Sequence, residues 1–163
     1  MEQKKKYITK EVALQKLQAY CAYQERCHSE VTKKLRDLGI FGDTADAIMG
    51  QLIEDNFLNE ELFAKAYARG KFRMKSWGKM RIQQELKMRY IPDYSIQQAM
   101  KAIDTEGGYL ETLERVIARK ALEYADNDPQ KTSKLFAYAF RRGFESELIS
   151  QVLKLIRLED DGF

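Results

Sequence analysis

The same spacing of apolar residues occurs three times along the chain. Measured from Ile40, Ile91 and Phe144, apolar residues recur nine and five positions earlier and five, eight, nine and twelve positions later. The three sets are Val31, Leu35, Ala45, Ile48, Met49 and Leu52; Ile82, Leu86, Ile96, Ala99, Met100 and Ile103; and Leu135, Ala139, Ile149, Val152, Leu153 and Ile156. This spacing is helical, and its repetition after 51 residues (40 to 91) and again after 53 (91 to 144) predicts a tandem array of one small helical unit. A unit of about 50 residues has little core of its own, so neighbouring units are expected to stack and share burial.

Three units of three helices each account for this pattern. No segment alternates β-branched and polar residues, so the predicted fold class is all-α, with three helix-turn-helix-like repeats at 9–57, 58–106 and 107–159 forming an elongated, curved array. The predicted helix starts include Thr9, Ser29, Asp43, Asn59, Pro92-Asp93 and Asp128-Pro129. Gly39 and Gly143 are placed to end the second helix of their units in a left-handed conformation. Tyr90 takes the same place in the middle unit, so that junction must close without glycine.

The bulk composition is typical of a soluble helical protein covered by charges. Hydrophobic residues make up 44% of the 163 residues and charged residues 33%. No apolar run approaches the roughly 20 residues of a membrane span, and no apolar signal segment follows Met1–Lys6, so we expect a cytoplasmic location without membrane contact. Cys21 and Cys27 fall one to two turns apart in one predicted helix, a spacing that favours free thiols over a disulfide.

No group of residues in the sequence predicts catalysis. Zinc needs about four ligands, and His28, beside Cys27, is the single histidine. A nucleophilic cysteine would need a base held in place by a third group, and Gly107-Gly108 lacks the Lys-Ser/Thr of a phosphate-binding loop. We therefore predict a non-enzymatic protein without metal or cofactor, in which Cys21 is a core residue and Cys27-His28 a helix end.

A basic block lies in the middle of the chain. Nine basic residues and one acid, Glu85, lie between Lys65 and Arg89, which gives this stretch a charge of +8 in a chain whose net charge is +3. The cations alternate with large apolar side chains. Cations suit phosphate contact with counterion release, and aromatic rings suit stacked bases or an apolar partner groove. The predicted binding residues are Arg69, Lys71, Arg73, Lys75, Trp77, Lys79, Arg81, Lys87 and Arg89.

Two interpretations of this block stay open. The cations can form a solvated face, with Trp77 packed between units. Alternatively they bind an anionic partner, which can be nucleic acid or an acidic protein groove. In the second interpretation the core that presents the cations is predicted to contain Phe63, Ala66, Ile82 and Leu86.

Several segments resemble motifs of one protein family. Residues 20–31, Tyr-Cys-Ala-Tyr-Gln-Glu-Arg-Cys-His-Ser-Glu-Val, resemble the first-repeat motif of RecX regulatory proteins, an aromatic residue before an Arg-Glu-Arg-Ser-like run. Residues 56–67, Asn-Phe-Leu-Asn-Glu-Glu-Leu-Phe-Ala-Lys-Ala-Tyr, resemble the family's Gly-Tyr-Leu-Asp-Asp-x-x-Phe-Ala-x-x-Tyr segment. Residues 77–86 resemble its Gly-x-x-Arg-Ile-x-x-Glu-Leu segment, and Arg142-Gly143-Phe144 matches the Arg-Gly-Phe of its third repeat. The chain departs from the family at Gln24, Cys27 and Tyr90, where arginine, serine and glycine are common.

The resemblance implies a specific function. RecX proteins consist of three tandem three-helix units and bind the filament of the RecA recombinase on single-stranded DNA, where they limit filament growth and suppress ATPase, strand-exchange and coprotease activities. A RecX-like protein is thus expected to be a monomeric inhibitor that acts in homologous recombination, DNA repair and the SOS response. Its expected partners are the RecA filament, single-stranded DNA and duplex DNA.

An alternative function follows from the helix-turn-helix-like geometry alone. In it the chain is a DNA-binding protein that acts independently of RecA, with Arg81 or Lys87 entering a groove of duplex DNA. Such a protein would bind duplex DNA tightly, in a salt-sensitive manner, and would show no preference for a filament.

Overall fold

The computed structural model describes residues 8–161, with side chains up to residue 157, and this part of the chain forms nine helices and no strand. The all-α prediction is confirmed. The helices are α1 (Lys10–Tyr23), α2 (His28–Asp37), α3 (Gly42–Glu54), α4 (Glu60–Lys75), α5 (Lys79–Met88), α6 (Asp93–Glu106), α7 (Tyr109–Ala121), α8 (Lys131–Arg141) and α9 (Ser146–Asp161). Met1–Lys6, which entered the prediction of location, lie outside the described residues. None of the helices between residues 8 and 161 combines the length and hydrophobicity needed to cross a bilayer.

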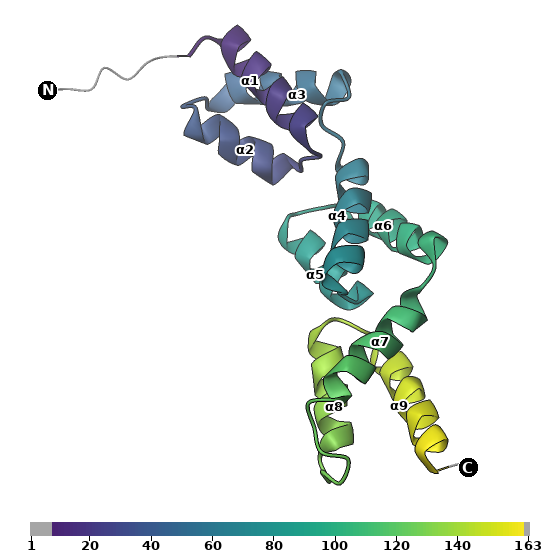
Figure 1. Cartoon of the computed structure of the whole chain (residues 1–163). Helices are drawn as coiled ribbons and strands as arrows, with labels where there is room; N and C mark the ends of the chain where they lie inside the picture. The colour runs from purple at the N-terminus through teal and green to yellow at the C-terminus, as the bar shows by residue number, and fades with distance from the viewer. Residues whose placement is uncertain (1–7, 162–163) are drawn as a thin grey trace, which may run out of the picture.

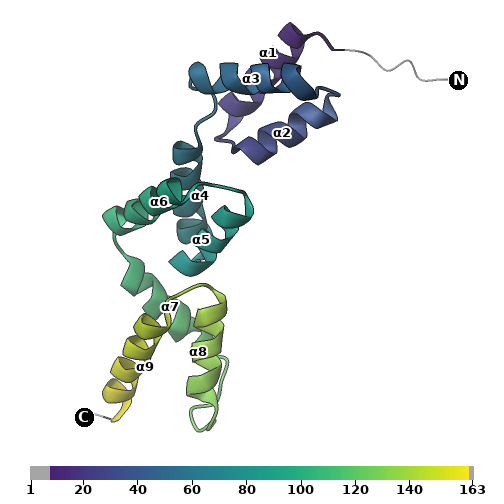
Figure 2. The same ribbon diagram turned by 180° about the vertical axis from the view of Figure 1, so that it is seen from behind.

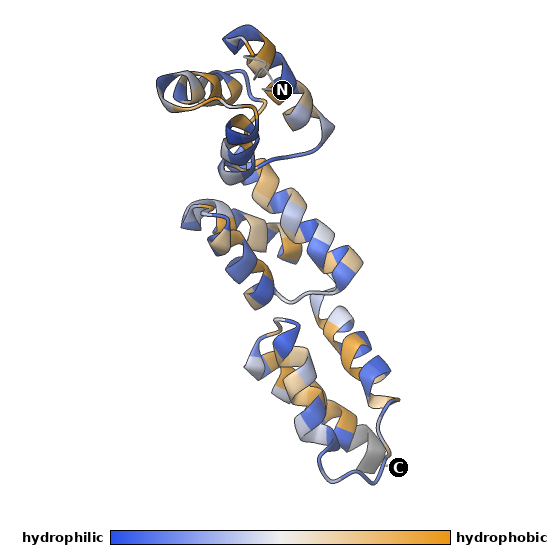
Figure 3. Ribbon diagram, turned by 90° about the vertical axis from the view of Figure 1, so that its left-hand side faces the viewer, coloured by the Kyte–Doolittle hydropathy of each residue, from blue (hydrophilic) through white to orange (hydrophobic). Residues whose placement is uncertain are grey.

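The helices form three successive groups with separate cores. The groups, here called repeat 1 (α1–α3), repeat 2 (α4–α6) and repeat 3 (α7–α9), follow one another along an elongated molecule (Figure 1), and the reverse view in Figure 2 shows the same separation. All 21 positions of the threefold apolar pattern are buried or half-buried. Figure 3 shows polar and apolar residues alternating around most helices, as expected when one face of each packs inward. The predicted tandem helical array is therefore confirmed. The expected sharing of burial between repeats is limited, because each repeat has its own core and residues such as Cys27 and Tyr109 connect one core to the next.

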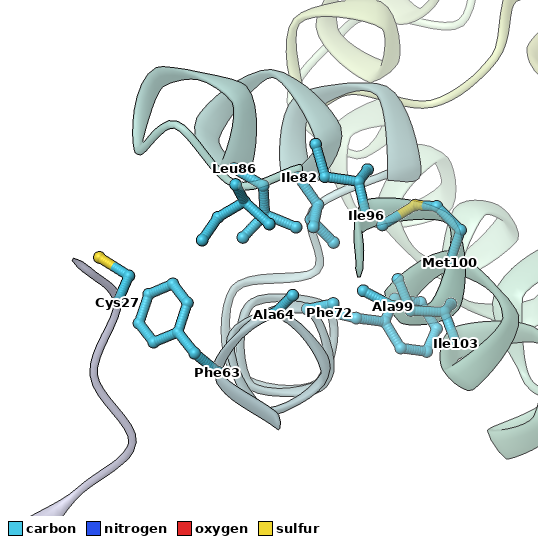
Figure 4. Close-up of a cluster of buried hydrophobic side chains, with 12 residues drawn as sticks. Cys27, Phe63, Ala64, Phe72, Ile82, Leu86, Ile96, Ala99, Met100 and Ile103 are labelled. Carbon is cyan, nitrogen blue, oxygen red and sulfur yellow. The ribbon is translucent and has the colours of Figure 1, made fainter. Parts of the chain in front are cut away.

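The core of repeat 2 determines how the basic block is presented. Phe63, Ile82 and Leu86 are buried, as predicted, and belong to one hydrophobic cluster with Ile96, Ala99, Met100 and Ile103 of α6 (Figure 4). Ala66 is exposed, which corrects its assignment to the core. The buried face of α4 instead carries Ala64, Ala68 and Phe72. Two positions correspond to about 200° around a helix, so Ala66 points away from the face formed by its neighbours at two residues either side.

Of the six predicted helix starts, Thr9, Asn59 and Pro92-Asp93 are confirmed, whereas Ser29, Asp43 and Asp128-Pro129 are offset from the observed starts. The Thr9 hydroxyl accepts a hydrogen bond from the amide of Val12 (3.2 Å), and the Asn59 side chain accepts from the amides of Glu61 and Leu62 (3.0 and 3.1 Å). Ser29 lies inside the first turn of α2, which begins at His28. The Asp128 carboxylate accepts from the amide of Gln130 (2.8 Å) in a turn, and α8 starts only at Lys131. Asp128 thus closes a side-chain turn ahead of the helix, a common alternative use of aspartate.

Three equivalent turns end α2, α5 and α8. Gly39 and Gly143 adopt positive φ values of 76° and 98°, as predicted for left-handed helix stops. Tyr90 makes the same turn in repeat 2 with a φ of 59°. A β-carbon in this conformation clashes with its own backbone, at a cost of about 1–2 kcal/mol. Repeat 2 therefore has a strained tyrosine at the position where repeats 1 and 3 have glycine, which adopts this conformation without strain.

The two cysteines lie in different structural contexts. Cys21 belongs to α1, whereas Cys27 follows the break after that helix and caps α2, so the prediction that both lie in one helix is wrong. Both are free and buried, and burial raises the pKa of each thiol, which keeps them protonated at neutral pH. Cys27 packs into the core of repeat 2 beside Phe63 (Figure 4). This cysteine therefore helps to join repeat 1 to repeat 2.

Repeats 2 and 3 are joined through their backbones. The amide of Gly78 donates to the carbonyl of Arg142 (2.8 Å), and the amide of Met80 donates to the carbonyl of Gly143 (2.9 Å). The guanidinium of Arg142 also donates to the carbonyl of Lys75. A β-carbon on Gly78 would lie 2.3 Å from the carbonyl carbon and oxygen of Gly143, so these two segments of the backbone meet at two residues that have no side chain.

Tyr109 adds a polar connection at the same junction. Its hydroxyl accepts a hydrogen bond from the amide of Lys79 (3.0 Å) and lies 2.9 Å from both carboxylate oxygens of Glu145, to which it donates. Its ring packs between those of Phe72 and Phe144, with centroids 5.7 and 5.4 Å away. Burial, reinforced by the Glu145 carboxylate, raises the pKa of the Tyr109 hydroxyl above 10.0.

This raised pKa predicts a loss of stability in alkali. The unfolded chain releases the Tyr109 proton near pH 10, whereas the folded chain retains it, so the free energy of unfolding must fall as the pH rises above about 10. We expect Tyr109→Phe to be less stable than the wild type at neutral pH by about 1 kcal/mol, for the lost hydrogen bonds, and to lose less stability between about pH 8 and pH 11. Urea unfolding at both pH values measures this. Tyr94→Phe, at an exposed position, serves as the control, and equal alkaline losses in both variants would contradict the assignment.

Candidate functional site

The predicted binding residues do not form one continuous surface. Three of the cations face acids at the end of α6. The Nε atom of Arg73 lies 3.0 Å from a carboxylate oxygen of Glu106, and that of Arg69 lies 4.0 Å from the other. Lys79 forms an ion pair with Asp104. We call Arg69, Arg73 and Lys79 the acid-paired flank. Much of the positive charge on this side is compensated within the protein.

A second group of cations lies over aromatic rings. The Arg81 guanidinium carbon is 4.0 Å from the centre of the Trp77 ring, and the Lys71 ammonium is 5.0 Å from the same centre. The Arg89 guanidinium carbon is 4.7 Å from the ring centre of Tyr67. We call Tyr67, Lys71, Trp77, Arg81 and Arg89 the aromatic–cation cluster. Such contacts hold cations in place by attraction to the ring face without neutralising their charge.

Helical geometry explains the division. On α4, Lys71 is separated from Arg69 and from Arg73 by two positions each, or about 200° around the axis. The face between them is buried by Ala68 and Phe72. The basic block therefore wraps around α4, and one of its flanks meets α6 while the other meets α5.

The remaining predicted residues differ in their surroundings. Lys75 and Lys87 are exposed, and neither forms an ion pair within residues 8–157. Arg89 is held by the carboxylate of Glu85 (3.2 Å) and by the main-chain carbonyl of the same residue (3.1 Å). Trp77 is half-buried against the core of repeat 2, so one part of its side chain packs against the core and the other part is exposed at the surface.

Two hollows lie at the repeat junctions on the side of the molecule that carries α2, α5 and α8. These helices follow one another down one edge of the array in Figure 1, here called the α5 edge. The hollow between repeats 1 and 2 has a volume of about 510 Å³, and its lining residues are His28, Ser29, Thr32, Lys33, Arg36, Glu60, Arg89 and Tyr90. The hollow between repeats 2 and 3, of about 290 Å³, is lined by Met80, Arg81, Gln84, Glu85, Met88, Phe140, Arg141 and Gly143. Each hollow contains one member of the aromatic–cation cluster, so the three features share one edge.

The sequence alone does not bring these residues together. Lys33, Arg36 and Arg141 lie outside the basic block, and they reach the α5 edge only because the repeats stack. Among the lining residues outside the basic block, Tyr90 has a sequence signal, since it replaces glycine at a repeated turn.

The arrangement is chemically suited to binding an anionic polymer. Its cations can contact phosphates and its aromatic rings can stack on bases. Among the described residues, no group of three or more histidine, cysteine, aspartate or glutamate side chains is placed to hold a metal ion.

By its fold, the chain is an all-α protein built of stacked three-helix repeats. Comparison with known proteins identifies its family. The model of the second three-helix domain of RecX matches residues 59–100, and that of the third domain matches residues 108–153. The chain belongs to the RecX family.

Individual relatives extend over most of the chain. The regulatory protein RecX of Prosthecochloris aestuarii is 26% identical over 142 residues, which cover 86% of this chain and 91% of the relative. That of Lactobacillus gasseri is 29% identical and covers 99% of this chain, which spans 59% of that longer relative. The crystal structure of RecX from Lactobacillus salivarius superimposes with a TM-score of 0.78 at 22% identity, covering 91% of this chain and 97% of that one. At this identity the structural likeness concerns the fold.

Proposed function

We propose that the chain is a non-enzymatic regulator that binds the RecA filament on single-stranded DNA and lowers its recombinase, ATPase and coprotease activities. The observation that carries the proposal is the consecutive match of the second and third RecX domains in one chain. Relatives matched over most of the chain are named regulatory proteins. The same proposal places the chain in the bacterial cytoplasm, as a monomer acting in DNA repair and the SOS response.

The geometry supports occupancy of a groove in the filament. An elongated array can follow a groove over several protein subunits, whereas a compact domain of this size contacts one site. The α5 edge supplies Lys71, Arg81 and Arg89, and the first two form no ion pair with an acid in the part of the chain whose side chains are described. Attraction to a nucleoprotein filament then brings the array into the groove, where its bulk obstructs the motions needed for hydrolysis and strand exchange.

The test is a set of parallel titrations at one salt concentration. RecA–single-strand filaments, free single strands and duplex DNA are each titrated with the chain, and the ATPase rate of the filaments is followed. We expect filaments to bind most tightly and the ATPase rate to fall to a low plateau. Tight, salt-sensitive duplex binding with an unchanged ATPase rate would overturn the proposal and favour the DNA-binding protein that acts independently of RecA.

A further inference from the structure

We propose that the hollow between repeats 1 and 2 is a subsite for single-stranded DNA, in which Lys33 and Arg36 contact a phosphate and the ring of Tyr90 stacks on a base. The subsite rests on the proposed function for the choice of DNA as ligand, but it requires no contact with RecA. Its volume of about 510 Å³ falls within the range of pockets that hold small-molecule ligands.

The charges of the hollow favour an anion. Lys33, Arg36 and Arg89 line it together with a single carboxylate, that of Glu60. This carboxylate is occupied by His28, whose Nδ1 atom lies 3.2 Å from one oxygen and whose amide donates to the other (3.3 Å). Neither Lys33 nor Arg36 takes part in an ion pair within residues 8–157. The hollow thus offers cations that the protein itself leaves available.

Two further features suit a phosphodiester. The side chains of Ser29 and Thr32 line the hollow on the same face of α2 as Lys33 and Arg36. The Thr32 hydroxyl can donate to a phosphate oxygen, whereas the Ser29 hydroxyl lies 3.1 Å from the sulfur of Cys27. Arg89 is fixed by its two contacts with Glu85 and also belongs to the aromatic–cation cluster. A strand bound in the hollow is therefore directed along the α5 edge toward Trp77.

Tyr90 supplies the reason to expect an unstacked base. Its side chain is 84% exposed and forms part of the lining, so the core makes little use of the ring. Its backbone has a φ of 59°, while Gly39 and Gly143 make the equivalent turns without strain. A strained residue with an exposed aromatic ring beside available cations is the arrangement that binds single strands, whose bases present free faces. Duplex DNA keeps its bases stacked and offers none to this ring.

The test uses the full chain and a fluorescently labelled oligothymidylate, with binding followed by anisotropy. We expect Tyr90→Gly to raise the melting temperature, because it relieves the strained turn, and to weaken binding by at least about fivefold, since stacking on one base is lost. We expect Lys33→Glu/Arg36→Glu to weaken binding by at least about tenfold, while the control Lys10→Glu/Lys16→Glu, on exposed positions of α1, has a smaller effect.

The results that would overturn the subsite differ from the results that would overturn the proposed function. Unchanged oligothymidylate binding in Tyr90→Gly, or equal losses in the α2 and α1 charge variants, would overturn the subsite. Absence of oligothymidylate binding by the wild type would do the same. The proposed function fails instead if the wild type leaves the RecA ATPase rate unchanged, and the binding comparison among variants still decides the subsite in that case.

Discussion

Gly78→Ala is expected to lower the free energy of unfolding by at least about 3 kcal/mol and to separate repeat 3 from repeat 2. The new β-carbon would lie 2.3 Å from the carbonyl carbon and oxygen of Gly143 and 2.4 Å from the amide nitrogen of Phe144. These are backbone atoms, so no side-chain rotation relieves the clash, and overpacking of a tight contact costs about 1–3 kcal/mol or more. Separation also removes the two hydrogen bonds made by the amides of Gly78 and Met80, each worth about 1 kcal/mol.

A matched substitution within the same repeat isolates this contact. Gly70 lies inside α4, and a β-carbon there would meet no atom within 4 Å. Gly70→Ala is therefore expected to stabilise the protein by about 0.5–1 kcal/mol, as alanine is the better helix former. Urea unfolding monitored by circular dichroism gives both free energies, and hydrogen exchange at the amides of Gly78 and Met80 shows whether the junction opens. Protected junction amides in Gly78→Ala would contradict the proposed basis of the contact.

The architecture follows from the sequence because it depends on local periodicity. The threefold recurrence around Ile40, Ile91 and Phe144 predicts the buried positions of α2, α3, α5, α6, α8 and α9, since a helix places residues three and four apart on one face. The first helix of repeat 2 is less well predicted, since its sequence suggests an apolar face of Leu62, Phe63, Ala66, Tyr67 and Gly70. Leu62 and Ala66 are exposed, whereas Ala64 and Ala68 are buried, because apolar residues surround much of α4 and the packing of α6 decides which face is used. The unit boundaries at 57/58 and 106/107 stay a prediction.

The site is less predictable because it depends on contacts between distant segments. A run of cations such as Lys71, Arg73 and Lys75 fixes the charge of a segment, but the acids of α6 that cancel part of it are about 30 residues away in sequence. Likewise, Gly143 is predicted as a helix stop, while its contact with Gly78 depends on stacking of whole repeats. The sequence thus identifies a basic region, and the fold decides which of its cations are available.

The second large effect is expected for the available cations of the aromatic–cation cluster. Lys71→Gln/Arg81→Gln keeps most of each side chain's apolar stem against the Trp77 ring and removes two charges that form no ion pair within residues 8–157. We expect the affinity for RecA–single-strand filaments to fall at least tenfold. The slope of log affinity against log salt concentration is expected to decrease by about 1.4, since each lost phosphate contact on a single strand contributes about 0.7.

The most direct measurement compares this variant with Arg69→Gln/Arg73→Gln, which removes the same number of charges from the same segment on the acid-paired flank. Filament affinity is determined for both variants and the wild type over a range of salt concentrations, with melting temperatures recorded to confirm folding. The structure predicts a loss of at least tenfold for Lys71→Gln/Arg81→Gln and a clearly smaller loss for Arg69→Gln/Arg73→Gln, because both of these guanidinium groups contact Glu106, whose single negative charge offsets part of theirs. Equal losses in the two variants, or a larger loss on the acid-paired flank, would contradict the assignment of filament binding to the α5 edge.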